Sequence, residues 1–405
     1  MSYRFVKIAG FYRNFLKYYY NTYPGVKERS YQEQYDHLMG QNFGYADSFA
    51  KAFRSLGIEA QEILHNAGPL QAAWAKEHGS GKMGHDLIIA QLKHLKPEVV
   101  YIQDGTHFSA QFVNTIRNEV PSVRIITGYY CSPYAPDVFD TFRSYDFILS
   151  CSPQFQQILN NHDIPNYLLY HAFNPRVLDT ISTTEKSLDM LFVGSFISQK
   201  DFHSDRLRFV EAMLAQDVPL ALCGSIEVNK GLTLLGKQVA YGLSRFLPAV
   251  GLKNYVANHP ILNKFQRLAE MPQKTKVSNR FIRSFIAEPK YGSPMFELLS
   301  KAKIGFNIHG GIAGDYAANI RMFEVTGVNS LLLTEEKKNI RDLFEPDREI
   351  VTYSSLEECI EKTKWLLEHK DELQKISSAG QQRTLKDHTV QKRVELLDGI
   401  FRKYL

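Results

Sequence analysis

The stretch 85-HDLIIAQLKHLKPEVVYIQD-104 decides the class of fold. Residues 85–96 carry apolar side chains at helical spacing, and residues 97–104 read as a strand whose centre is apolar on both faces. A strand without a polar face is typical of a parallel sheet that is covered on both sides. A helix followed by such a strand therefore predicts one unit of an alternating α/β fold.

The same alternation continues along the chain. In the first half it predicts helices at 45–57, 108–120, 137–145 and 153–163, and strands at 58–64, 123–130, 146–152 and 167–172. A polar segment, 174–188, reads as a linker, after which the alternation restarts with strands at 189–195, 218–225, 303–310 and 329–334. We therefore expect two doubly wound parallel-sheet domains, 1–178 and 179–386, that face a cleft. Ligands of such sheets lie beyond the carboxyl ends of the strands.

Composition indicates a soluble globular protein. The chain has 405 residues, of which 44% are hydrophobic and 22% charged. No secretory signal and no run of about 20 apolar residues is found, so a cytoplasmic protein is expected. The four cysteines show no C-x-x-C spacing and favour a reducing compartment over a disulfide framework. They are Cys131, Cys151, Cys223 and Cys359.

The segment 226–290 is strongly basic. It holds eleven Lys or Arg residues against three acidic ones, a local charge of +8, whereas the whole chain carries +5. Such a segment predicts an anionic partner, either a phosphate-bearing substrate or an anionic membrane surface, or else forms a solvated basic face. The apolar part, 231–252, reads as a membrane-interface element or as a core helix pair of the second domain. No nucleic-acid signature accompanies the charge, so no nucleic-acid partner is expected.

The aromatic and basic N-terminus offers a second candidate for a membrane interface. Arg4, Lys7, Arg13 and Lys17 stand there among Phe and Tyr residues. Basic and aromatic side chains on one segment are typical of helices that lie at the bilayer surface. We therefore expect a peripheral position at the inner face of the membrane as one way in which the protein works.

The stretch 309-HGGIAGDYAANIRMFE-324 carries the strongest chemical signal. Its glycines allow backbone N–H groups to approach a ligand, and Arg321 can form bidentate bonds with phosphate. Glu324 lies three residues further on the same helical face and can accept from a pair of ribose hydroxyls. The alternative is a surface Arg–Glu pair beside a flexible loop.

The first domain offers candidates for a general base in 101-YIQDGTHF-108. Asp104 and His107 follow a predicted buried strand, where a base can reach an acceptor hydroxyl. Asp104 can instead shape a turn, and His107 can pack at a helix end. Asp137 is a weaker candidate. Tyr129, Tyr130 and Tyr134 can stack on sugar rings or belong to the core.

Several stretches in a fixed order resemble a known family. They are N-x-R-x-F-E at 319–324, the apolar strand that ends at Thr334, and the segments 343–367 and 379–393. Together they look like the C-terminal half of the CgeB-like (spore-maturation type) glycosyltransferases, which belong to the two-lobed GT-B class of nucleotide-sugar transferases. The segment 192–213 resembles the start of their second lobe. The similarity covers residues 187–400 and implies a GT-B fold of two Rossmann-like domains, with a terminal helix, 387–405, that returns to the first.

The resemblance also implies roles for individual residues. Arg321 would face the donor diphosphate and Glu324 the donor ribose. The remaining donor-site residues implied by the family pattern are Ser195, Lys200, His203, Arg206, Asn307, His309, Gly310, Gly311, Asp315 and Asn319. Many retaining members carry two glutamates eight positions apart, whereas here the nearest upstream acid, Asp315, stands nine positions before Glu324. The stereochemical course therefore stays open.

The expected function is a glycosyltransferase of the hexosyltransferase kind. It would move a sugar from a nucleotide-sugar donor to a saccharide or lipid-linked acceptor, in the synthesis of a cell-surface polysaccharide or glycoconjugate. No D-x-D pair follows a strand, so neither a metal nor another cofactor is expected. The alternatives are a nucleotide-sugar epimerase or hydrolase, and a non-catalytic protein that binds nucleotides or sugars.

Overall fold

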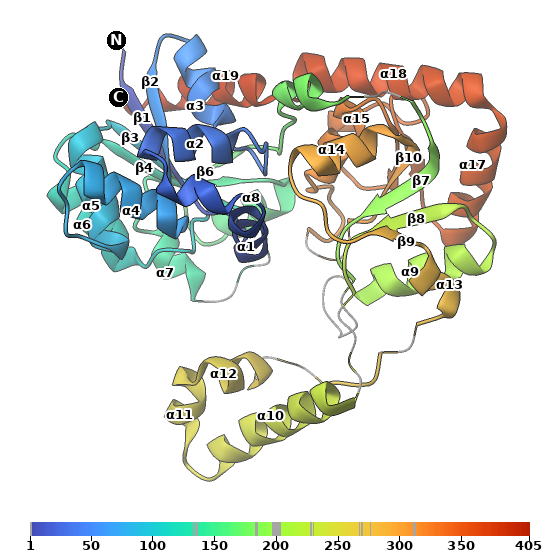
Figure 1. Cartoon of the computed structure of the whole chain (residues 1–405), viewed down its shortest axis with the longest axis horizontal. Helices are drawn as coiled ribbons and strands as arrows, with labels where there is room; N and C mark the ends of the chain where they lie inside the picture. The colour runs from blue at the N-terminus through green and yellow to red at the C-terminus, as the bar shows by residue number, and fades with distance from the viewer. Residues whose placement is uncertain are drawn as a thin grey trace.

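The computed structural model shows two α/β domains side by side and a helical hairpin that projects from the second (Figure 1). It describes residues 2–132, 134, 137–182, 185–196, 204–226, 229, 231–266, 268, 270–275, 277–309, 311 and 313–405, without the side chains of residues 204 and 205. Each domain is built on a six-stranded sheet in which every strand pairing is parallel. The predicted fold class is confirmed.

The sheet of the N-terminal domain has the order β2-β1-β3-β4-β5-β6. Its strands are β1 (Arg4–Ala9), β2 (Glu59–Leu64), β3 (Val99–Ile102), β4 (Ile125–Tyr130), β5 (Phe147–Ser150) and β6 (Asn166–Leu168). The helices of this domain are α1 (Arg13–Thr22), α2 (Tyr31–Met39), α3 (Ser48–Ser55), α4 (Gly68–Glu77), α5 (Gly84–Leu95), α6 (Ala110–Glu119), α7 (Val138–Phe142) and α8 (Pro153–Asn160). The central strands are buried on both faces because helices cover both sides of the sheet.

The sheet of the C-terminal domain has the order β12-β11-β10-β7-β8-β9. Its strands are β7 (Leu188–Val193), β8 (Leu220–Cys223), β9 (Phe285–Ala287), β10 (Ala302–Asn307), β11 (Leu331–Glu335) and β12 (Val351–Tyr353). The helices packed around it are α9 (Ser204–Ala215), α13 (Asn279–Arg283), α14 (Ser293–Ser300), α15 (Arg321–Gly327), α16 (Ile340–Leu343), α17 (Leu356–Glu368) and α18 (Lys370–Asp387).

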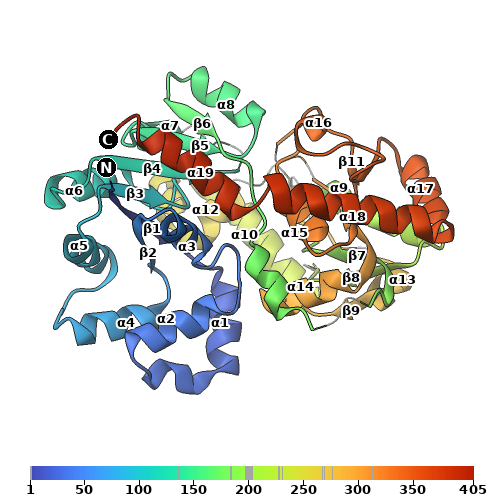
Figure 2. The same ribbon diagram turned by 90° about the horizontal axis from the view of Figure 1, so that it is seen from above.

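The chain crosses between the domains twice at one place. It leaves the N-terminal domain through residues 170–174 and returns through the junction between α18 and α19 (Val390–Phe401). The backbone N–H of Phe173 donates to His388 O at 2.8 Å, and that of Val390 donates to Phe173 O at 2.9 Å. Figure 2 shows α18 lying along the C-terminal domain and α19 along the N-terminal one. Phe401 of α19 then joins the same buried cluster as Phe5 and Phe53.

The N-terminal residues form part of the first domain. Residues 4–9 are the buried strand β1, and α1 buries Phe15 and Tyr19. Lys7 is only 1% exposed, because its ammonium group pairs with Glu62 on β2 at 2.9 Å. Burial is tolerated because each charge neutralises the other. The prediction of a membrane interface is therefore wrong for Lys7, whereas Arg13 and Lys17 lie on the exposed side of α1.

The hairpin consists of α10 (Gly231–Ala249), α11 (Lys253–Asn258) and α12 (Pro260–Gln266). These helices pack against one another and project from the C-terminal domain, as Figure 1 shows. Leu232 and Phe246 of α10 are 87% and 61% exposed. The interpretation of 231–252 as a core helix pair is therefore wrong. No helix within the described residues has the length and apolar character that a bilayer crossing requires.

We expect Lys7→Ala to lower the free energy of unfolding by about 3–5 kcal/mol, because it leaves the buried Glu62 carboxylate without its cation. The double variant Lys7→Met, Glu62→Leu should recover much of that loss, since it replaces the ion pair by apolar side chains of similar volume. Urea unfolding measures both. Lys93→Ala, which breaks an exposed ion pair with Glu119, is the control and should change stability little. Equal losses in the single and double buried variants would contradict the structural role of the pair.

Candidate active site

A cavity of about 290 Å³ lies where the two domains meet. Cys131 and His171 line it from the N-terminal domain. The lining residues of the C-terminal domain are Phe192, Val193, Gly194, Arg206, Asn307, His309, Ala313, Tyr316, Ala318, Asn319, Ile320 and Arg321. Most of them follow the carboxyl ends of β7 and β10, which are neighbours in the sheet. This is where ligands bind in open parallel sheets.

A chain of side-chain hydrogen bonds positions the start of α15 at this cavity. Asn307, at the end of β10, donates to Thr334 Oγ1 at 2.9 Å. The side-chain oxygen Oδ1 of Asn307 accepts from Asn319 Nδ2 at 2.8 Å. Asn319 Oδ1 in turn accepts from the backbone N–H of Arg321 at 2.8 Å. Buried amides with both ends bonded hold a single orientation. The loop before α15 is therefore tied to the sheet, and Arg321 is held at the cavity wall.

Arg321 and Glu324 form a buried ion pair one helical turn apart. Arg321 Nη1 lies 2.7 Å from Glu324 Oε2, and the side chains are 18% and 9% exposed. Glu324 Oε2 nevertheless has no hydrogen-bond donor among the described residues. Burial raises the pKa of Glu324, and the charge of Arg321 opposes that rise. The pair is not a surface pair, and it places the Glu324 carboxylate next to the cavity wall.

Arg206, on α9, is a second buried guanidinium at the cavity. It is 8% exposed and donates to Ser195 O at 3.2 Å and to Ile308 O at 3.1 Å. In the described part of the chain no carboxylate lies within ion-pair distance of it, and its Nε has no hydrogen-bond partner. Burial lowers the pKa of Arg206 to about 10, so it stays charged at neutral pH. A buried cation without a counterion is costly, and an anionic ligand would neutralise it.

Two histidines that face the cavity are uncharged at neutral pH. Burial, with Lys337 and Arg206 nearby, lowers the pKa of His309 to about 3. Burial and the charge of Arg393 lower the pKa of His171 to about 4. His309 Nε2 lies 3.1 Å from Thr334 Oγ1, while its Nδ1 has no partner among the described residues. Both imidazoles therefore act as hydrogen-bonding groups and not as cations.

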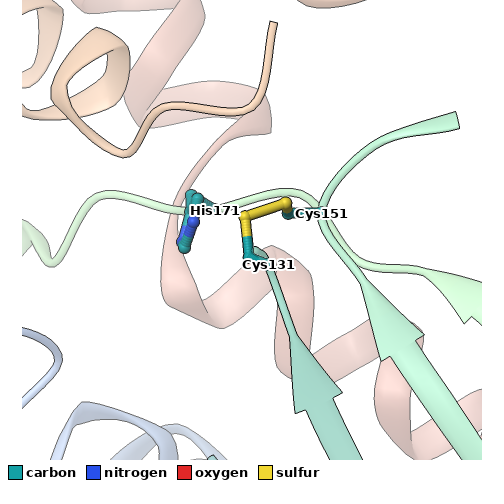
Figure 3. Close-up of side chains that lie close together, drawn as sticks. All are labelled: Cys131, Cys151 and His171. Carbon is teal, nitrogen blue, oxygen red and sulfur yellow. A yellow bond between two sulfur atoms is a disulfide. The ribbon is translucent and has the colours of Figure 1, made fainter. Parts of the chain in front are cut away.

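A disulfide joins Cys131 to Cys151 beside His171, as Figure 3 shows. The two cysteines follow β4 and β5, which are adjacent parallel strands, so 20 residues of sequence separate side chains that meet in space. The prediction of unpaired cysteines is wrong for this pair, and the cysteines no longer support a reducing compartment. The two sulfurs and one ring nitrogen of His171 lie within 4.8 Å of one another. Thiolates, not disulfide sulfurs, ligate metals, so the oxidised pair is not a metal site.

The structure brings together some of the predicted site residues. Five of them line the cavity: Arg206, Asn307, His309, Asn319 and Arg321. Glu324 does not line it but pairs with Arg321, which does. Ser195 contributes its carbonyl to Arg206. Gly311 is described but does not line the cavity. Lys200, His203 and Gly310 lie outside the described residues.

Three predicted site residues lie apart from the cavity. Asp315 is exposed and pairs with Lys338 at 2.8 Å, which lowers the pKa of Asp315. Asp104 is exposed, and its Oδ1 accepts from the backbone N–H of Thr106 at 3.1 Å, as a turn-shaping aspartate does. His107 packs against the ring of His65 at 4.3 Å. None of the three belongs to the cavity lining.

Cys131 and His171 are the lining residues that the sequence did not point to. Cys131 directly follows β4, and His171 closes the predicted strand 167–172. Only their position in the sequence could have indicated a site, because both come after a strand of a parallel sheet, on the side where ligands bind. Tyr129 and Tyr134, considered for sugar stacking, pack in the core cluster of the N-terminal domain or against it.

Comparison with known proteins gives one family-model match and several similar structures. Residues 279–398 match the family model described as Glycosyl transferase-like. No curated protein sequence matches the chain. Among solved structures it is similar to a glycosyltransferase from Rickettsia africae ESF-5, with a TM-score of 0.55 and 10% identity over 100% of this chain and 98% of that one.

Two further structures show the same likeness. Sucrose-phosphate synthase from Thermosynechococcus elongatus has a TM-score of 0.54 at 10% identity, over 99% of this chain and 98% of that one. Anabaena Alr3699/HepE in complex with UDP-glucose has a TM-score of 0.54 at 10% identity, over 99% of this chain and 100% of that one. The fold is that of the GT-B glycosyltransferases. The matched C-terminal segment and this fold support the predicted class of function, a glycosyltransferase.

We expect the double variant Cys131→Ala, Cys151→Ala to lose about 3 kcal/mol of the free energy of unfolding, because the disulfide closes a loop between residues 20 positions apart. Urea unfolding should show the same loss when the wild-type protein is treated with dithiothreitol. The stability of the double variant should not change with dithiothreitol. This variant is the control for effects of the reductant on the rest of the protein, since it retains the free cysteines Cys223 and Cys359. A wild-type unfolding midpoint that is independent of the reductant would contradict the pairing.

A second prediction concerns His171 and pH. The unfolded chain protonates this residue as the pH falls through about 6.5, whereas the folded chain does so only near pH 4. The stability that His171 contributes is therefore present above pH 6.5 and is lost as the pH falls toward 4. We expect His171→Asn to remove about 2–3 kcal/mol of the fall in unfolding free energy between pH 7.5 and 4.5, measured by urea unfolding. Parallel pH profiles of wild type and variant would show that His171 is not buried in its neutral form.

Proposed function

We propose that this protein transfers a sugar from a nucleotide-sugar donor to a saccharide or lipid-linked acceptor, as a hexosyltransferase of the CgeB-like type in polysaccharide or glycoconjugate synthesis. The observation that carries the proposal is a pair of guanidinium groups, the buried Arg206 and the partly buried Arg321, on one cavity at the carboxyl ends of β7 and β10. Guanidinium groups bind phosphate oxygens with strong, charge-assisted hydrogen bonds. Among the described residues Arg206 donates to two neutral carbonyls and pairs with no carboxylate, and a diphosphate would supply the counterion.

In this proposal the donor diphosphate lies between Arg206 and Arg321. As the bond to the sugar breaks, negative charge grows on the leaving nucleoside diphosphate, and two fixed cations stabilise it in a site with little water. No metal ion is then required to neutralise the leaving group. The carboxylate of Glu324 would accept from the donor ribose, and His309 Nδ1 would bond a further polar group of the donor. Asn307 and Asn319 hold this arrangement in place.

The acceptor would enter from the N-terminal domain. A general base must come within about 3 Å of the acceptor hydroxyl. We keep Asp104 and His107, at the carboxyl end of β3, as the proposed base and its neighbour, although they lie outside the donor cavity. His171 faces the cavity with Nδ1 bonded to Tyr45 Oη at 2.7 Å and would orient the sugar. An acceptor carried on a lipid would require work at the cytoplasmic face of a membrane, which we include in the proposal.

We expect Glu324→Gln and Arg321→Lys each to weaken donor binding by about 10–100-fold, since each removes charge-assisted hydrogen bonds worth about 1.5–3 kcal/mol. Thermal-shift and calorimetric titrations with UDP, GDP, dTDP, CMP and their common sugars measure the effect. The matched control is Glu345→Gln, which changes an exposed Arg–Glu pair of the same spacing. A wild-type protein that binds none of these nucleotides, or a Glu324→Gln variant that binds them normally, would overturn the donor site.

Release of nucleoside diphosphate separates transfer from the alternatives. A transferase releases the nucleotide rapidly only when a glycan acceptor from a saccharide or lipid-linked panel is present. Release without acceptor would indicate a hydrolase, and conversion of the donor sugar without release would indicate an epimerase. Tight binding with neither reaction would identify a non-catalytic binding protein.

A further inference from the structure

The hairpin of α10, α11 and α12 exposes an unusual amount of apolar surface. Along α10 the exposed apolar side chains recur every three or four residues, which places them on one face of the helix. Tyr255 of α11 and Ile261 of α12 are a further 54% and 57% exposed. The exposed large apolar residues of α10 and of the turn after it are Leu232, Leu235, Val239, Leu243, Phe246, Val250 and Leu252.

This exposed face does not hold the hairpin together. A separate set of side chains does, since Val256 is fully buried and Leu262 and Phe265 are 7% and 9% exposed. The segment that follows α12 is hydrogen-bonded to α10, by Gln238 Nε2 to Pro272 O at 3.0 Å and by Arg245 Nη2 to Leu268 O at 2.7 Å. The outer face is thus an exposed apolar surface on a formed element, which marks an interaction site.

The charge of the hairpin identifies the kind of partner. Residues 231–266 include four basic side chains and no Asp or Glu. A second copy of the chain would bring one cationic hairpin against another, which like charges disfavour. An anionic bilayer surface complements both properties, since it accepts apolar side chains between its headgroups and attracts Lys and Arg. The four basic residues are Lys237, Arg245, Lys253 and Lys264.

We propose that the hairpin docks on an anionic lipid bilayer, with the exposed face of α10 inserted among the headgroups and the exposed Lys253 and Lys264 on the lipid phosphates. The docking is peripheral, because no helix within the described residues, α10 included, is long and apolar enough to cross a bilayer. In Figure 1 the hairpin extends below the space between the two domains, so docking would bring the interdomain site toward the lipid surface. The part of this proposal that concerns the acceptor rests on the proposed function: the acceptor would reach the cleft from the membrane.

Vesicle sedimentation of the full chain tests the proposal. We expect binding to vesicles of phosphatidylcholine with about 30% phosphatidylglycerol, weak binding to phosphatidylcholine alone, and a steep fall in binding between low and high salt. The double variant Leu235→Glu, Phe246→Glu should lose at least tenfold in binding, and so should Lys253→Glu, Lys264→Glu. The matched control is Met83→Glu, at an exposed apolar residue of the N-terminal domain, and it should bind like the wild type.

Two outcomes would overturn the proposal. One is absence of binding to anionic vesicles, or binding that neither double variant weakens. The other is a dimer in light scattering that Leu235→Glu, Phe246→Glu dissociates, which would make the face a contact between copies. Nucleotide thermal shifts on the same samples keep the two proposals apart. A hairpin variant that loses vesicle binding but keeps its nucleotide shift separates membrane docking from the donor site.

Discussion

The backbone bridge between Phe173 and Thr389 is the contact on which the two-domain arrangement depends. Both crossings of the chain pass through it, and Arg393 reinforces it by donating to the carbonyls of Tyr170 and His171. The ring of Phe173 packs so closely on Gly327 that a Cβ there would lie 2.5 Å from it. Gly327 ends the helix that starts at Arg321, and His171 stands two residues before Phe173. Both sides of the cavity are therefore connected to this one junction. A hinge motion between the domains would turn about it.

Two sets of buried polar groups in this protein differ in how they are satisfied. Lys7 and Glu62 neutralise each other within the N-terminal sheet and act structurally. Arg206, Glu324 Oε2 and His309 Nδ1 instead lack part of their hydrogen bonding, and all three lie at or beside one cavity. An unsatisfied buried polar group costs about 1–3 kcal/mol. Such costs gathered at one place are typical of a site that a polar ligand completes, because the ligand recovers them on binding.

Much of the fold could be read from the sequence, and the misses have physical causes. Strands made of uninterrupted apolar runs, such as β3 and β11, were predicted, whereas β1 was missed because Lys7 and Arg4 give it a polar pattern. The strands β9 and β12 have three residues each, too few to show a period. Within the site, helical spacing identified Arg321 and Glu324. Cys131 and His171 could not be found in the same way, because they meet only through the order of strands in a sheet. The exposure of α10 likewise depends on where its apolar face points, which periodicity does not reveal.

The packing of α19 has a consequence for the order in which the protein is made. The N-terminal domain is discontinuous, since Phe401 fills its core beside Phe5 and Phe53. During synthesis the first six strands emerge long before this helix does, whereas the second domain is complete once α18 has left the ribosome. The later domain in the sequence can thus finish folding first. The earlier domain must wait, with an apolar groove open along its sheet, until the last residues of the chain arrive.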